Sequence, residues 1–416
     1  MSKSLENEGT HPVLGVGQSI IELVRYRPGM YVGSTDYHGL HWMLWDVIVY
    51  GLNQHLAGVA DHISIRLSSD GSISVEDNGP GMVVDAVSGT KSVLERSLTE
   101  LTSQEKRSHP IGYQVAPDFL FDDMLFVANA LSSRLVAEVK RDGYLWHQEY
   151  ERGVPQTDAV RLQHTVGTGT KFILWPDVTI FKDARVDRNF LLEKMRMTCY
   201  LNPRLNVQIV DGRSEQEHVY DFRFPDGVRS YVRSLTGIRH AVHEPIVVST
   251  TVSTTRIDIA LQYNSDDMTN VLTFANNYYT PDGGAHLIGF YLALIRVLND
   301  QNRMADPHNR KDTSYDELPA LQNVRRGLCA IVSIWLVKPQ FENATKERLY
   351  NPEVKEQVTA AVTEGLMRHF EQVPQDRDRI VRHLTSGNLI QRYTTPLTRD
   401  EQAAWDEFHG TASAET

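Results

Sequence analysis

The sequence has 416 residues, with 42 lysines and arginines against 53 aspartates and glutamates, a formal charge of −11. That length is typical of two or three domains whose cores need no cross-links, and the acidic balance argues against a protein that coats nucleic acid. The two cysteines, Cys199 and Cys329, lie outside any Cys/His cluster, so neither a disulfide framework nor a zinc site is expected. The apolar runs are much shorter than the ~20 residues that cross a bilayer, so we expect a cytoplasmic protein without membrane spans.

The first half of the chain predicts helices and strands in alternation. A helix near 18–26 must end before Pro28-Gly29, and apolar residues at helical spacing predict a longer helix over 39–57. Residues 62–79 form two alternating runs around Asp70-Gly71, the pattern of a β-hairpin. The polar stretch 90–125 predicts irregular structure up to a helix near 120–131, and strands are expected within 134–177.

The second half predicts another set of elements. A helix over 188–200 and a strand pair precede alternating segments at 256–264 and 270–277. The turn TPDGGAHL (280–287) opens a helix with an apolar stripe, and the apolar run 329–337 has the length of a strand. A loop over 340–349 and a helix over 352–370 follow. The final stretch, 376–416, carries five arginines and seven acidic residues.

Several of these segments, taken together and in this order, resemble the N-terminal half of the DNA gyrase B protein and its topoisomerase IV counterpart. They cover about 25–390 and comprise RYRPGMYVGST (25–35), DNGPGM (77–82), VANALS (127–132), RDG (141–143), ERGVPQ (151–156), GTGTKFILWPD (167–177), LQYN (261–264), FANN with PDGGAHLIGF (274–290), RRGL (325–328) and TKERL (345–349). The resemblance implies an α+β chain: a GHKL (Bergerat) α/β sandwich followed by a ribosomal S5-like transducer domain.

The resemblance also implies boundaries and partners. An N-terminal arm (1–24), a GHKL ATPase-like domain (25–222), a transducer-like domain (223–392) and a tail (393–416) are expected. In the family the arm mediates dimerisation, so we expect a homodimer or a heterodimer with a gyrase-type subunit. The family's EGDSAGG motif at the DNA-cleavage centre does not occur in this sequence, so we do not expect DNA cleavage by this chain alone. The net-acidic 376–416 segment replaces a basic family helix, which argues against DNA binding.

The motifs predict a small-molecule pocket on the adenine side of the family's nucleotide site. There, an Asp after a strand and a Thr in the GTGT strand bind the adenine, and both match here as Asp77 and Thr170. Gly79 and Gly81 would let a ring approach the backbone. Arg141 matches a family arginine at the pocket mouth that aminocoumarins also contact. The alternative is that Asp77-Asn78-Gly79 only ends a hairpin.

The catalytic half of the site departs from the family, whose cofactors are ATP and magnesium. The family helix WEVVDNSIDEALAG corresponds to WDVIVYGLNQHLAG (45–58). The general-base glutamate becomes Asp46, and a ~1 Å retreat can cost about a hundredfold in rate. The magnesium-holding asparagine becomes Tyr50, which offers a hard cation no carbonyl or carboxylate oxygen. Lys346 matches a lysine that contacts the γ-phosphate, while Ala344 replaces the glutamine of that loop. We therefore assign no metal ligand, and the cofactor is left unknown: the resemblance implies ATP and magnesium, whereas these motifs argue against them.

The phosphate lid differs most. In the family, the phosphate lid has the sequence GGLHGVG. An ungapped alignment that runs from VANALS toward the N-terminus places DFLFDDM (118–124) at these positions, so Asp118, Asp122 and Asp123 stand in place of lid residues. Three carboxylates facing a triphosphate of about −4 would repel it by several kcal/mol. DFLFDDM is either the start of a helix with Asp in its first turn or a new acidic ligand or metal site.

These departures predict a gyrase-B-like protein that is deficient in ATP hydrolysis and acts by binding a small molecule or a gyrase-type partner. Two alternatives stay open. One is an enzyme that uses acidic groups of the former ATP pocket for new chemistry. The other is a genuine ATP-dependent type II topoisomerase half, which the motifs favour least because function depends on the site rather than on the fold.

Overall fold

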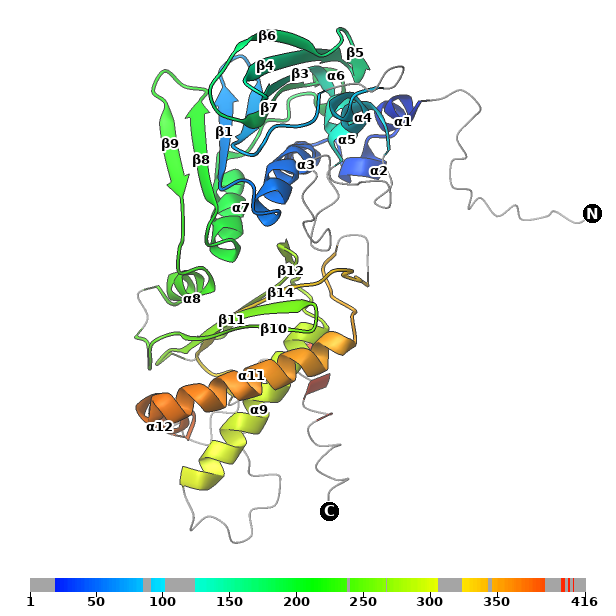
Figure 1. Ribbon diagram of the computed structural model, residues 1–416. Coiled ribbons are helices and arrows are strands. Elements are labelled where there is room, and N and C mark those ends of the chain that lie inside the picture. The colour runs from blue at the N-terminus through cyan, green and yellow to red at the C-terminus, as the bar shows by residue number, and fades with distance from the viewer. Residues whose placement is uncertain are drawn as a thin grey trace, which may run out of the picture. The chain divides into compact units, whose positions relative to one another are not determined.

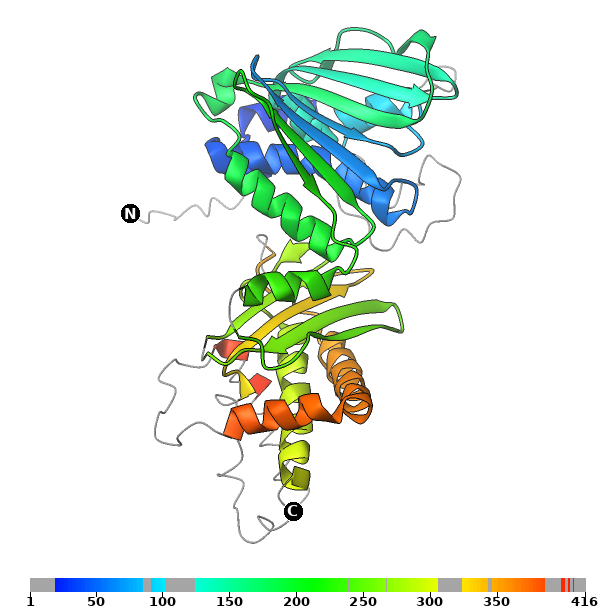
Figure 2. The same ribbon diagram turned by 90° about the vertical axis from the view of Figure 1, so that its left-hand side faces the viewer.

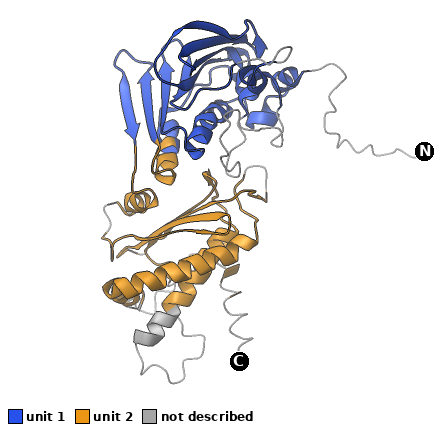
Figure 3. Cartoon of the chain, viewed as in Figure 1, with its two compact units in different colours: residues 1–115, 120–194, 206–222 blue, residues 116–119, 195–205, 223–416 orange. Residues whose placement is uncertain are grey.

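The computed structural model describes residues 19–84, 91–101, 124–237, 240–266, 268–305, 324–342, 346–385, 398–400, 403–404 and 407. The chain divides into two compact units (Figure 3). Unit 1 holds the described residues up to Lys194 and Asn206–Phe222, and unit 2 holds Met195–Leu205 and the described residues from Arg223 onward. Within these ranges, none of the helices combines the length and hydrophobicity that a membrane crossing needs.

Unit 1 is built on a mixed sheet (Figure 1). Its nine strands within the described ranges follow the order β5-β4-β3-β7-β2-β1-β8-β9, with β6 beside β4. Only β1 and β8 among these neighbours pair in parallel. The strands are β1 His62–Ser68, β2 Ile73–Asp77, β3 Ser132–Arg141, β4 Tyr144–Glu151, β5 Val154–Pro155, β6 Val160–His164, β7 Gly169–Pro176, β8 Asn206–Gly212 and β9 His218–Phe222.

Several helices of unit 1 begin at residues whose side chains cap them. The Ser19 hydroxyl accepts a hydrogen bond from the Glu22 N–H, and the Glu22 carboxylate accepts one from the Ser19 N–H, a capping box. Asp36 caps the long helix α3, which is buried along most of its length. The helices are α1 Ile20–Tyr26, α2 Gly29–Val32, α3 Tyr37–Leu56, α4 Val93–Thr99, α5 Leu125–Ala130 and α6 Val178–Phe181, and α7 Arg188–Leu201 runs from unit 1 into unit 2.

Unit 2 is a second sheet covered on both faces. Its five strands within the described ranges follow the order β10-β11-β14-β12-β13, with β12 and β14 parallel. Helices α9, α11 and α12 pack on one face and α8 on the other (Figure 2). The elements are α8 Val228–Thr236, β10 Ile246–Val252, β11 Thr255–Tyr263, β12 Asn270–Ala275, β13 Tyr278–Tyr279, α9 Ala285–Ala305, β14 Leu328–Trp335, α11 Glu353–Gln372 and α12 Pro374–Thr385.

The structure confirms the predicted α+β class and most predicted elements, including the 62–79 hairpin and the helices over 39–57, 188–200 and 352–370. The prediction of irregular structure from residue 90 was wrong, because α4 lies there. The Ser92 hydroxyl accepts a hydrogen bond from the Glu95 N–H, and Leu94 and Leu98 are buried. A capped helix of only two turns is too short to show a clear apolar period.

Candidate ligand site in unit 1

Strand register brings together the two residues that the sequence matched to adenine binding. Strand β2 ends at Asp77, and its pairing with β7 places Glu76 opposite Lys171. Asp77 follows Glu76 on β2 and Thr170 precedes Lys171 on β7, so these two residues lie at the next position of the two adjacent strands. Both residues are buried, with 3% of Asp77 and 1% of Thr170 exposed.

Asp77 is a buried acid with one unused oxygen. Its Oδ1 accepts a hydrogen bond from the Gly79 N–H at 2.7 Å, whereas its Oδ2 has no hydrogen-bond partner among the described residues. Burial raises the pKa of Asp77 to about 7, although the Gly79 N–H works in the opposite direction. A buried acceptor without a partner is costly, so this oxygen marks a position where a ligand's N–H would be stabilising.

The glycines of the DNGPGM turn are required by the protein's own packing. A Cβ on Gly79 would lie 2.7 Å from Asp77 Oδ1. Gly81 has a φ of +81°, and a Cβ there would lie 2.6 Å from the Lys140 carbonyl oxygen. The predicted approach of a ligand ring to these glycines remains a prediction.

Tyr50, on α3, contacts strand β7. Its hydroxyl lies 3.3 Å from Thr170 Oγ1, and its ring meets the Phe172 ring edge-on at 5.5 Å between centroids. Thr170 Oγ1 also accepts a hydrogen bond from the Met82 N–H at 3.0 Å. Asp46, one turn earlier on α3, is half-buried. Tyr50 and Thr170, which the resemblance aligns with the magnesium and adenine positions of the family, are thus in contact with each other.

Arg141 completes the cluster from the end of β3. Its Nη1 donates a hydrogen bond to the Gly81 carbonyl at 2.7 Å, and its Nε lies 3.3 Å from the Asp142 carboxylate. Its guanidinium therefore holds the turn that follows Asp77. Unit 1 gathers six of the predicted site residues: Asp77, Gly79, Gly81, Thr170, Tyr50 and Arg141.

Of the remaining predicted residues, Asp46 lies on α3 in unit 1 and Lys346 lies in unit 2. The Lys346 ammonium is 3.9 Å from the centroid of the Tyr278 ring. Asp118, Asp122 and Asp123 lie outside the described residues, so the acidic site remains a prediction. Within the described ranges, no group of three or more His, Cys, Asp or Glu side chains is placed to hold a metal ion.

Gln54, one turn after Tyr50 on α3, is a candidate site residue that no sequence motif predicted. It is 4% exposed, and its Oε1 has no hydrogen-bond partner among the described residues. Its Cβ and Cγ lie 3.4 Å from the point where a Cβ on Gly79 would stand, so the stem of this side chain lies beside the glycine turn. The i+4 spacing from Tyr50 placed Gln54 on the same helical face and was the signal available in the sequence.

Comparison with known proteins shows that the chain is similar to DNA gyrase B proteins. A family model described as DNA gyrase B matches residues 227–391. The gyrase B protein of Archaeoglobus fulgidus is 36% identical over 358 residues, 85% of this chain and 55% of that protein. The 43K ATPase domain of Thermus thermophilus gyrase B, solved with an aminocoumarin, superposes with a TM-score of 0.76 and 28% identity over 95% of this chain and 97% of that one.

This chain is a homologue of the ATPase region of DNA gyrase B. The gyrase B protein of Myxococcus xanthus is also similar, with a TM-score of 0.71 and 26% identity over 87% of this chain and 99% of that one. The chain spans about half the length of the curated gyrase B relatives that it matches.

Two motifs that carry the gyrase resemblance are structural in this homologue. Asn129, in VANALS, is fully buried, and its Nδ2 donates a hydrogen bond to the Leu98 carbonyl at 2.7 Å. Asn264, in LQYN, donates to the Gly327 carbonyl of RRGL at 3.2 Å. Both carboxamide nitrogens donate to buried backbone carbonyls, so these two matches have a role in the packing of the fold.

Proposed function

We propose that this gyrase-B-like protein binds an amine-bearing small molecule on the adenine side of its pocket and is deficient in ATP hydrolysis. It would then act by binding, either as a receptor for that molecule or through a gyrase-type partner. A second copy of the same chain is the other partner that the resemblance suggests. The 416 residues lack the EGDSAGG motif, so we also propose that they do not cleave DNA alone.

The contact between Tyr50 and Thr170 carries this proposal. Magnesium prefers carboxylate, carboxamide and water oxygens in an octahedral arrangement. A neutral phenol that is already 3.3 Å from a threonine hydroxyl, in a largely buried position, does not fit that requirement. We therefore derive no catalytic step through magnesium. Asp46 adds to the argument, because its carboxylate is one methylene shorter than the general base implied by the resemblance.

Two unpaired acceptors support retained binding of a ligand with N–H donors. Asp77 Oδ2 and Gln54 Oε1 are both buried without a partner among the described residues, and both side chains adjoin Gly79. Leaving such groups unpaired costs about 1–3 kcal/mol each, which a ligand amine would recover. Thr170 and Arg141 complete the set that matches residues around the adenine and aminocoumarin pocket of the family.

Turnover and binding should be measured separately on the purified chain. We expect no saturable hydrolysis with ATP and magnesium, but a rise in melting temperature with adenosine or an aminocoumarin. A ligand at 100 times its Kd adds about 2.7 kcal/mol, or about 5–10 °C for a unit of this size. Asp77→Leu should remove the rise, whereas Glu149→Gln, on the exposed Arg134 pair, should preserve it.

The two measurements distinguish the alternatives. Saturable ATP turnover that depends on magnesium would overturn the proposed deficiency and support an ordinary topoisomerase ATPase. Absence of any stabilisation would overturn the retained pocket. The double variant Asp46→Glu with Tyr50→Asn restores both family residues, and it should bind magnesium-ATP better than the parent protein if these two positions cause the deficiency.

A further inference from the structure

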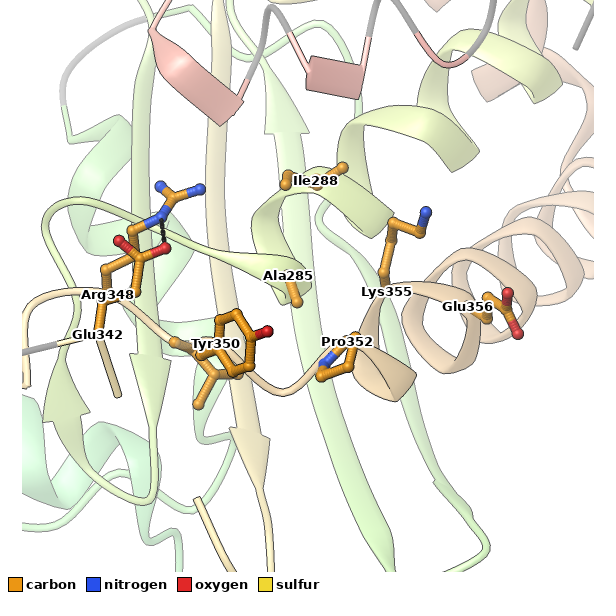
Figure 4. Close-up of a pocket in the computed structure, with 9 residues that line it drawn as sticks. Ala285, Ile288, Glu342, Arg348, Tyr350, Pro352, Lys355 and Glu356 are labelled. Atoms are coloured by element: carbon orange, nitrogen blue, oxygen red, sulfur yellow. Dashed lines mark hydrogen bonds and ion pairs between the residues drawn. The ribbon is translucent and has the colours of Figure 1, made fainter. Parts of the chain in front are cut away.

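The loop of the TKERL motif in unit 2 is held by one buried arginine. The Arg348 side chain is 10% exposed, and its guanidinium reaches acceptors from three separate segments. Its Nε donates to Glu342 at 2.9 Å, as Figure 4 shows, and its Nη1 donates to the Asp282 carbonyl at 2.5 Å. Its Nη2 forms an ion pair with Asp400, which lies 52 residues further along the chain.

Asp400 is buried within unit 2. Its side chain is 2% exposed, and its carboxylate also accepts a hydrogen bond from the Gly284 N–H of the PDGG turn. A Cβ on Gly283 would lie 2.2 Å from Asp400 Oδ2, so only glycine leaves room for the carboxylate there. Ala404, one turn later, is fully buried in the core of unit 2.

The same C-terminal segment makes two further ion pairs with other residues of unit 2. Arg399 lies 3.2 Å from Glu342, and Glu407 lies 2.7 Å from Lys355. Lys355, Glu342 and Arg348 line a cavity of about 350 Å³ (Figure 4). Glu342, Arg348 and Lys355, which line this cavity, are thus each ion-paired with a residue of the C-terminal segment.

Backbone hydrogen bonds connect the PDGG turn to residues that follow Lys346. The Asp282 N–H donates to the Glu347 carbonyl and the Leu349 N–H to the Gly283 carbonyl, both at 3.0 Å. Lys346 itself has a φ of +59°, a left-handed conformation that a non-glycine residue keeps only when its surroundings enforce it. In that conformation its ammonium lies 3.9 Å from the Tyr278 ring centroid.

We propose that the described residues of 398–407 form an intramolecular latch, in which Asp400, through Arg348, positions Lys346 on the Tyr278 ring. Asp400 and Arg348 are positioning residues in this scheme. Any contact that Lys346 makes with a ligand then depends on whether the C-terminal segment is docked. This inference does not depend on the proposed function, because every contact in it lies within unit 2.

Acetylation of lysines in the full chain, followed by mass spectrometry, tests the latch. In Asp400→Asn, we expect Lys346 to react at least about threefold faster relative to Lys338, because local opening frees its ammonium from the ring. Arg348→Lys keeps the positive charge but loses the planar fork, and it should raise the same ratio. Glu364→Gln, on an exposed pair with Arg368, is the matched control and should leave the ratio unchanged.

Hydrogen exchange separates latch opening from unfolding. The amide of Leu349 should exchange faster in Asp400→Asn, while amides of β14 keep their protection. A Lys346-to-Lys338 ratio within twofold of the parent value in either variant, with β14 still protected, overturns the proposal. Equal acceleration at all lysines and in β14 in both variants also overturns it, because Asp400 would then support the whole unit rather than position one loop.

Discussion

Replacement of Asp177 by asparagine should destabilise unit 1 in a pH-dependent way. Asp177 is 1% exposed, and its Oδ2 lies 2.7 Å from Arg25 on α1 and 3.3 Å from Arg152. Its Oδ1 accepts hydrogen bonds from the Thr179 N–H and hydroxyl at 2.9 and 2.7 Å. This one carboxylate therefore ties the first helix to the end of β7 and caps α6.

The magnitude follows from the pKa. Burial alone would raise the pKa of Asp177, but the hydrogen bonds from Thr179 and Arg25 outweigh it and lower the pKa from 3.8 to about 2. At about 1.4 kcal/mol per pH unit, the drop corresponds to about 2.5 kcal/mol of stability. Because the folded pKa is depressed, this contribution is present above about pH 4 and is lost as the pH falls toward 2.

Urea unfolding, followed by circular dichroism and by hydrogen exchange of β7 amides, measures the effect. At pH 7 we expect Asp177→Asn to lose about 2–3 kcal/mol, since Arg25 keeps a partly buried charge without its partner. The difference from the parent protein should shrink as the pH falls below 4. Glu149→Gln, on the more exposed pair with Arg134, should cost less than about 1 kcal/mol. A loss at Asp177 no larger than this control, or one independent of pH, would refute the reasoning.

Three further predictions concern the ligand site. Gly81→Ala should cost about 2–4 kcal/mol in urea unfolding, because it adds a backbone clash to a left-handed φ, whereas Gly143→Ala has open space and should cost about 1 kcal/mol. Asp77→Asn should lose adenosine-induced stabilisation. It should nevertheless be more stable than the parent protein at pH 8. Because the pKa of Asp77 is raised to about 7 in the folded state, the stability of the parent protein falls as the pH rises from 4 through 7. Tyr50→Phe should cost about 0.5–1.5 kcal/mol by melting temperature, and an unchanged value would mean that its hydroxyl bond is energetically neutral.

The sequence alone located most helices and strands, and it named six of the seven residues of the candidate site, all except Gln54. Local patterns were sufficient for the 62–79 hairpin and the long helix α3, because their periods are regular over many residues. The resemblance to gyrase B supplied Asp77, Thr170 and Arg141, since each stands in a recognisable motif. Patterns failed for short or polar elements such as α4 and α12, whose formation depends on caps and packing.

The tertiary structure alone decided which side chains meet. Asp177 with Arg25 and Asp400 with Arg348 join residues 152 and 52 positions apart, and no local period relates such partners. Packing of α3 against the sheet likewise placed the Tyr50 hydroxyl against Thr170, while burial left Asp77 Oδ2 and the unpredicted Gln54 Oε1 without partners among the described residues. Periodicity encodes which face of an element is apolar, whereas the buried ion pairs of Asp177 and Asp400 and the unpaired acceptors beside Gly79 arise only when distant segments close around the same buried atoms.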